Sequence, residues 1–158
     1  MVKKANQKVW MLRRLKQYNI CEEDLIEIYI TCIRGKLEYC VPVWNASLTE
    51  DDKTEIERIQ KIALKIILGE GYGGYQTALE MCLLKTLEER GEDLCLSFAL
   101  SCSNNKNHKE FFTINENKLL HYPPKYQPPL CLHERYKKSP IPYLTDLLNK
   151  FYEEKPDA

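Results

Sequence analysis

The sequence lacks any apolar run approaching the roughly 20 residues that a membrane-spanning helix needs. Residues 1–16 are polar and basic, without the apolar stretch of a secretory signal peptide. The seven cysteines are odd in number, and none lies at the short Cys-to-Cys spacing of a structural zinc site. We therefore expect a soluble protein in a reducing, intracellular setting, nuclear or cytoplasmic, with no metal and no cofactor.

The chain also lacks net charge, with 23 Lys and Arg residues against 23 Asp and Glu residues. A self-standing nucleic-acid binder is usually basic, so this balance favours no particular partner. The charges are unevenly spread, however. Residues 1–20 contain six cations and no acid, whereas residues 50–57 contain five acids. A neutral total can therefore hide a basic surface near one end.

Helical periodicity dominates the 158 residues, of which 44% are hydrophobic and 29% charged. No strand pattern and no internal repeat rises above it. Thr49, followed by acids, predicts a helix start, and Thr86 with Glu89 has the spacing of a capping box. Gly91 interrupts the pattern of its helix. The expected helices cover about residues 4–18, 22–40, 50–68, 75–83, 86–103 and 141–151.

Residues 122–142 contain six of the eight prolines, which predicts an extended, polyproline-like segment. The predicted fold is an all-α bundle of about five helices with a Pro-rich, extended C-terminal tail. We place a helical domain at residues 1–103, and a loop and tail with a short terminal helix at residues 104–158. The expected core includes Leu25, Ile28, Ile33, Leu37, Ile59, Ile62, Ile66, Leu87, Leu94 and Phe98.

The order of several short motifs points to a family. The main motifs are Leu12-Arg13-Arg14-Leu15, Asp24-Leu25-Ile26-Glu27-Ile28-Tyr29, Ile33-Arg34-Gly35-Lys36-Leu37-Glu38-Tyr39, Pro42-Val43-Trp44, Glu57-Arg58-Ile59-Gln60-Lys61 and Ser139-Pro140-Ile141-Pro142-Tyr143-Leu144. Across about residues 5–150 this series resembles the C-terminal part, the thumb and downstream region, of reverse transcriptases from jockey-like, LINE-type non-LTR retrotransposons. The resemblance implies contact with template–primer duplex rather than chemistry, and packing against a reverse transcriptase palm.

The carboxylates of an RNA-directed DNA polymerase are missing. Polymerase chemistry needs acids that hold two divalent metals, and the only Asp-Asp pair is Asp51-Asp52 at a helix start. We therefore expect no enzyme activity from this chain alone. It would be a fragment, a truncated copy of a transposable element, or a remnant retained by a host.

The basic first helix is the predicted nucleic-acid-binding site. Arginines can form forked hydrogen bonds to phosphate oxygens, and lysines act as point charges. The partner would be an RNA–DNA hybrid or DNA duplex. For Trp10 and Trp44 we expect core packing rather than base stacking. The predicted site comprises Lys3, Lys4, Lys8, Arg13, Arg14 and Lys16.

Other functions also fit this composition. Neutral charge and the Pro123-Pro124 and Pro128-Pro129 pairs are typical of a helical protein-interaction or scaffolding module with no nucleic-acid role. A functionless element remnant is a third possibility, because helices that evolved to pack on a palm expose apolar surface without it.

Overall fold

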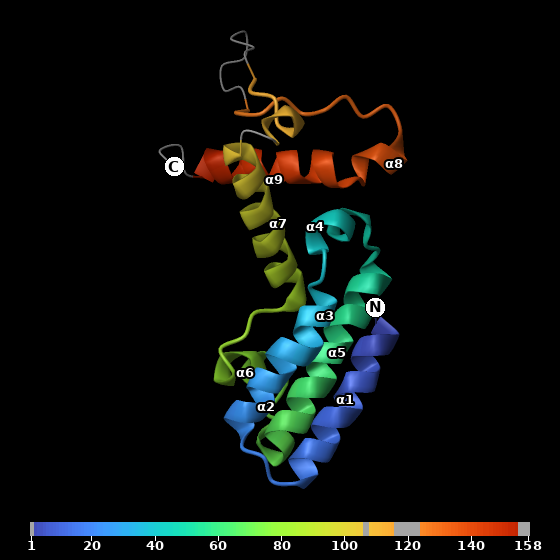
Figure 1. Cartoon of the computed structure of the whole chain (residues 1–158), viewed down its shortest axis with the longest axis vertical. Helices are drawn as coiled ribbons and strands as arrows, with labels where there is room; N and C mark the ends of the chain where they lie inside the picture. Colours follow the sequence, from blue (N-terminus) through green and yellow to red (C-terminus); the bar gives the residue numbers. More distant parts are fainter. Residues whose placement is uncertain (1, 106–107, 116–123, 155–158) are drawn as a thin grey trace. The chain divides into compact units, whose positions relative to one another are not determined.

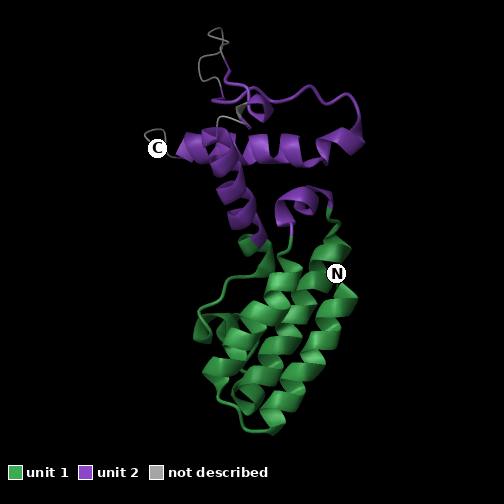
Figure 2. Cartoon of the chain, in the orientation of Figure 1, with its two compact units in different colours: residues 1–39, 48–90 green, residues 40–47, 91–158 purple. Residues whose placement is uncertain are grey.

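The structure, a computed structural model, describes residues 2–105, 108–115 and 124–154. The predicted all-α class is confirmed, since these residues form helices and no strand; Ile114 and Tyr126 make only an isolated β-bridge. The chain divides into two compact units (Figure 2): unit 1 holds residues 1–39 and 48–90, and unit 2 holds residues 40–47 and 91–158. The domain boundary expected at residues 103 and 104 stays a prediction; the contacts group the residues differently.

Unit 1 is built around long helices that lie side by side (Figure 1). α1 (Val2–Gln17) and α5 (Glu50–Leu68) pack together, beside α2 (Glu22–Ile28), a π-helical segment (Tyr29–Arg34) and α3 (Gly35–Leu37). Small and apolar side chains at three- and four-residue steps form the buried face of each helix. The buried residues are Ala5, Val9, Leu12, Leu25, Tyr29, Ile33, Leu37, Ile56, Ile59, Ala63 and Ile67.

The helix expected at residues 22–40 ends earlier. Cys40 has a left-handed backbone, with φ 56°, and its side chain is exposed. The left-handed residue breaks the helical register before α4 (Val41–Trp44), so the helix does not extend to residue 40. Pro42 lies in the first turn of α4, where its missing N–H costs no helical hydrogen bond.

The predicted helix start at Thr49 and the predicted capping box at Thr86 are confirmed, and Thr49 also forms a capping box. The Thr49 hydroxyl accepts a hydrogen bond from Asp52 N at 3.2 Å, and the Asp52 carboxylate accepts one from Thr49 N at 3.1 Å. Thr86 and Glu89 repeat this arrangement, at 3.2 and 3.1 Å, at the start of α7 (Leu87–Asn104). Reciprocal bonds of this kind satisfy backbone N–H groups that a helix start leaves unpaired.

A second cluster of unit 1 lies between α5 and α6 (Tyr75–Met81). Gly69, with φ 53°, ends α5 in a conformation that favours glycine. The buried members of this cluster are Leu64, Leu68, Ala78, Leu79 and Cys82.

Unit 2 contains α4, the C-terminal part of α7, α8 (Glu134–Lys137) and α9 (Pro140–Glu154). Residues 124–133 form no helix and are held by the side-chain amide of Asn149, which bonds both Tyr126 N and Tyr126 O, at 2.9 and 3.0 Å. Residues 122 and 123 of the Pro-rich segment lie outside the described residues, while Pro140 and Pro142 belong to the first turn of α9. The core consists of Val41, Cys95, Ala99, Phe112, Tyr126, Leu144 and Leu148.

Helix α7 continues through Gly91, where the sequence suggested an interruption. Gly91 is buried, and a Cβ at this position would lie 3.1 Å from Asn45 Oδ1. The glycine therefore reflects a close approach of Asn45 rather than a break in the helix.

The predicted core is mostly but not wholly correct. Nine of its residues are buried or half-buried: Leu25, Ile28, Ile33, Leu37, Ile59, Ile62, Ile66, Leu87 and Leu94. The prediction that Phe98 belongs to the core is wrong, because its side chain is 46% exposed. It lies at the edge of the apolar stripe of α7, beside the buried Cys95 and Ala99, and lines a pocket.

Candidate nucleic-acid interface

The exposed side of α1 is the strongest candidate surface for an anionic ligand. α1 buries Ala5, Val9 and Leu12 and has no acidic residue in its 16 positions. A helix advances about 100° per residue, so one apolar face leaves most of its circumference free for polar side chains. Basic side chains occupy much of that remainder.

Five of the six predicted site residues are exposed: Lys3, Lys4, Lys8, Arg13 and Arg14. In the part of the chain that the structure describes, the side chains of all of them except Arg14 make no ion pair and no hydrogen bond. Arg14 Nη1 donates a hydrogen bond to Gln17 Oε1 at 3.3 Å, on the same helix. Within the described residues, these five side chains therefore have no acidic partner.

Lys16 is placed differently from the other five. Its side chain is half-buried, and Nζ donates to the Ile67 carbonyl at 2.6 Å and pairs with the Glu22 carboxylate at 3.1 Å. A cation near the last carbonyls of a helix is favoured by the helix dipole. Lys16 therefore connects α1 to the C-terminal end of α5.

A ridge runs along the exposed side of α1. Its residues follow at steps of four and three, which places them on one line along a helix. Lys4 and Arg13 flank this line on opposite sides, whereas Lys8 lies farther around the helix, beside the buried face of Ala5 and Leu12. We call it the α1 ridge; its members are Lys3, Gln7, Trp10, Arg14 and Gln17.

Trp10 lies in the middle of the α1 ridge and is 61% exposed. The prediction that it packs in the core is wrong, because the buried face runs through Val9 and Leu12 and turns Trp10 outward. The Arg14 guanidinium lies over its ring, 5.4 Å from the centroid. Trp44, by contrast, is half-buried against the core of unit 2, as expected.

Sequence reasoning missed a buried polar network in unit 1. Tyr29 donates to Gln60 Oε1 at 2.5 Å, and Gln60 Nε2 donates to Tyr75 Oη and to the Lys85 carbonyl, both at 2.9 Å. Tyr75 donates in turn to Glu57, whose other oxygen accepts from Leu87 N at 3.0 Å. Gln60 lies on the buried face of α5, between Ile56 and Ala63, but periodicity alone gives no partner for it.

This network is suited to rigidity rather than to catalysis. Burial raises the pKa of the Tyr29 hydroxyl far above its usual range, and burial with the neighbouring Glu57 raises the pKa of Tyr75. Both hydroxyls therefore stay protonated and act as donors. In the described ranges, no group of three His, Cys, Asp or Glu side chains is positioned to hold a metal ion.

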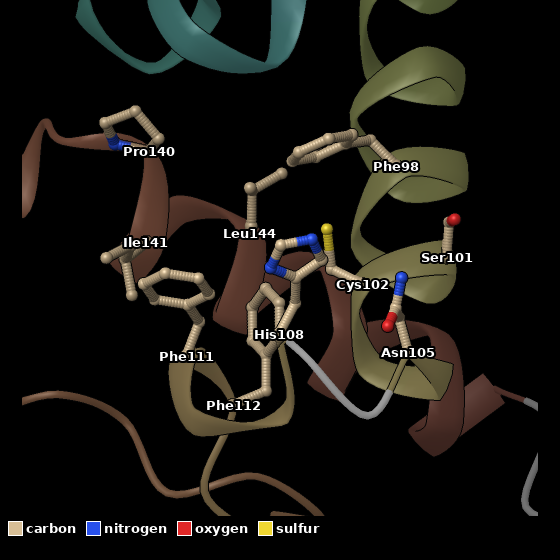
Figure 3. Close-up of a pocket in the computed structure, with 10 residues that line it drawn as sticks. All are labelled: Phe98, Ser101, Cys102, Asn105, His108, Phe111, Phe112, Pro140, Ile141 and Leu144. Atoms are coloured by element: carbon tan, nitrogen blue, oxygen red, sulfur yellow. The ribbon is translucent and has the colours of Figure 1, made fainter.

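Unit 2 carries an apolar pocket of about 480 Å³ (Figure 3). The aromatic ring of Phe98 lines it from α7, and the rings of His108, Phe111 and Phe112 line it from one short segment, residues 108–112. His108 and Phe111 are stacked, with ring centroids 6.1 Å apart. The other lining residues are Ser101, Cys102, Asn105, Pro140, Ile141 and Leu144.

Among the helices at residues 2–105, 108–115 and 124–154, none combines the length and the apolar character that spanning a bilayer requires. Compared with protein-family models, with curated proteins and with solved structures, the chain matches none of them.

Proposed function

We propose that this chain is a non-catalytic module that grips nucleic-acid duplex, an RNA–DNA hybrid or DNA, through α1. One observation carries the proposal: five cations of an acid-free helix are exposed, and four of them have no protein partner in the described part of the chain. The family resemblance of the sequence agrees with this role, that of the thumb region of a LINE-type reverse transcriptase.

Phosphate contact would supply the affinity. Each cation that neutralises a phosphate releases condensed counterions, which makes binding weaken as salt rises. Five contacts correspond to a slope of about −4.5 in a plot of log affinity against log salt. Lysines and arginines on a helix surface fix the position of a duplex but read no bases, so the binding would be independent of sequence.

The neutral total charge does not oppose this function. Acids elsewhere, as in the first turn of α5, take part in capping and in ion pairs such as Lys53–Glu50 and Lys53–Glu88, both at 2.9 Å. Local surface charge within about one Debye length, roughly 10 Å at 0.1 M salt, governs phosphate contact more than the total does.

A charge-matched pair of variants tests the proposal. The test variant combines Lys4→Ala, Lys8→Ala and Arg13→Ala, three exposed cations of α1 outside the α1 ridge. We expect it to bind a fluorescent RNA–DNA hybrid more weakly and to reduce the salt slope by about 2.7 units. The measurement is fluorescence anisotropy over a series of salt concentrations, on hybrids of two unrelated sequences.

The control removes the same net charge at exposed positions outside α1, through Lys36→Ala, Arg135→Ala and Lys150→Ala. The control should bind as the wild type does. Equal losses in the two variants would mean that total charge, and not α1, attracts the nucleic acid, and would overturn the proposal.

The pocket of unit 2 favours a second candidate, a protein-interaction module that accepts an apolar side chain of a partner segment. Phe98 and Phe111 remain about half exposed at its mouth, and the lining is almost entirely apolar. A folded chain that binds no hybrid at about 50 mM salt, where phosphate contacts are strong, would favour this function over the first.

A further inference from the structure

We infer that Trp10 stacks on an unpaired base, so that the α1 surface prefers nucleic acid with a single-stranded extension over a blunt duplex. This inference rests on the proposed function and names its substrate more closely. It has its own test, because loss of stacking and loss of phosphate contact affect different ligands.

The indole of Trp10 is not part of the buried core of unit 1. The neighbouring Val9 and Leu12 are buried, whereas Trp10 is 61% exposed on the opposite side of α1. An exposed tryptophan amid cations has the combination found in single-strand binders, an aromatic platform beside a positive surface.

Arg14 orders this platform. Its guanidinium lies 5.4 Å from the centroid of the Trp10 ring and is anchored by the hydrogen bond to Gln17. A cation over an aromatic ring is itself favourable and restricts the rotation of both side chains. With Arg14 on one side, the remaining exposed surface of the indole can meet a base.

Cationic side chains lie before and after Trp10 along the helix axis, within reach of the phosphates of a bound strand. At about 1.5 Å rise per residue, Lys3 lies roughly 10 Å before Trp10 along the helix axis, and Arg13 roughly 4.5 Å after it. A strand whose base stacks on Trp10 therefore finds cations for the phosphates on both sides of that base.

Base faces of a continuous duplex are covered by their neighbours. A protruding indole reaches them only by unstacking a step, which costs a few kcal/mol. An unpaired base has an open face at no such cost. The positive charge of the surface favours nucleic acid as the ligand. The exposed indole ring favours an unpaired base of that nucleic acid.

The test compares two ligands with the same number of phosphates: a blunt RNA–DNA hybrid and a hybrid with a single-stranded template extension. The variants are Trp10→Leu, which keeps an apolar side chain, and Trp10→Phe, which keeps an aromatic one. We expect Trp10→Leu to weaken binding of the extended hybrid at least about fivefold more than it weakens binding of the blunt hybrid. Trp10→Phe should retain most of the wild-type affinity for both.

A second readout uses Trp44→Phe as background, in which Trp10 is the remaining tryptophan. The extended hybrid should quench its fluorescence, and the blunt hybrid should not. Salt-dependent binding of both hybrids, unaffected by Trp10→Leu, would overturn this inference and leave the proposed function intact.

Two further outcomes would also decide the matter. Equal losses on both hybrids would assign Trp10 a general apolar contact instead of stacking. A fluorescence change that follows protein concentration without nucleic acid would show that a second copy of the chain covers the ring. Failure of the wild type to bind either hybrid would overturn the proposed function and this inference together.

Discussion

The buried network around Gln60 makes the most stringent prediction about the fold. Gln60 is fully buried and joins three partners: the Tyr29 hydroxyl, the Tyr75 hydroxyl and the Lys85 carbonyl. Gln60→Leu removes all three bonds while keeping a side chain of similar size. Tyr75 still donates to Glu57, so Tyr29 and the Lys85 carbonyl lose the most.

The magnitude follows from what is left unpaired. A buried polar group without a partner costs about 1–3 kcal/mol, so Gln60→Leu should lower the free energy of unfolding by about 2–6 kcal/mol. Tyr29→Phe alone removes the donor to Gln60 Oε1 and should cost about 1–3 kcal/mol. In the Gln60→Leu background, however, Tyr29→Phe removes an unpaired hydroxyl and should raise stability.

The assay is urea unfolding of the wild type, both single variants and the double variant, followed by far-UV circular dichroism. The expected result is a change of sign: Tyr29→Phe destabilises the wild type and stabilises the Gln60→Leu variant. If Tyr29→Phe lowers the free energy of unfolding equally in both backgrounds, the two side chains are not coupled and the network is refuted.

Three further perturbations test other parts of the structure. Asn149→Ala should lower the free energy of unfolding by about 2–4 kcal/mol, because both backbone groups of Tyr126 lose their bonds to the amide, and an unchanged urea midpoint would contradict this. Burial raises the pKa of the Cys95 thiol to about 11, so Cys95 should resist alkylation at pH 8 until the chain unfolds. Exposed cysteines should react at once. Labelling of Cys95 in the folded chain, detected by mass spectrometry, would contradict its burial. Because that pKa is raised, the stabilising effect of Cys95 is present below the unfolded thiol pKa of about 8.5 and is lost as pH rises toward 11. The difference in free energy of unfolding between the wild type and Cys95→Ala should therefore shrink over this pH range. Thr49→Ala should cost about 0.5–2 kcal/mol at pH 7 through loss of the α5 cap. Hydrogen bonds from Thr49 lower the pKa of Asp52, so their contribution is present above the unfolded pKa and should fade as the carboxylate protonates on acidification; a cost of Thr49→Ala independent of pH would contradict it.

The helices and their starts could be predicted because their causes are local. Thr49 and Thr86 each stand three residues before an acid, and the reciprocal bonds they form depend on nothing farther along the chain. The buried positions of α5, Ile56, Ile59 and Ala63, likewise follow from helical periodicity.

Long-range contacts explain what the sequence could not predict. Gly91 looked like a helix breaker, yet it makes room for Asn45, which lies far away in the sequence. Cys40 fits an apolar stripe by spacing, but its left-handed backbone takes it out of the helix. Polar partners such as Gln60 and Tyr29 are invisible to periodicity, since both resemble ordinary helix residues until their elements pack.

The candidate site also combines features that the local sequence predicts with features that only long-range packing determines. Charge counting alone was sufficient to select α1, and five of its six cations are exposed. Lys16 is held by the Ile67 carbonyl, a residue 51 positions away, which no local pattern reveals. The spacing alone allows Trp10 to lie on the buried face or on the exposed face of α1. Only the packing of Val9 and Leu12 in the core turns its side chain outward.

The most direct test of the proposed function is the salt dependence of wild-type binding to a fluorescent RNA–DNA hybrid, followed by anisotropy. Saturable binding whose log affinity falls with log salt at a slope of about −4.5 between roughly 50 and 200 mM is the expected result. No saturable binding at about 50 mM salt by the folded chain, or binding that does not weaken with salt, would contradict a phosphate-gripping α1.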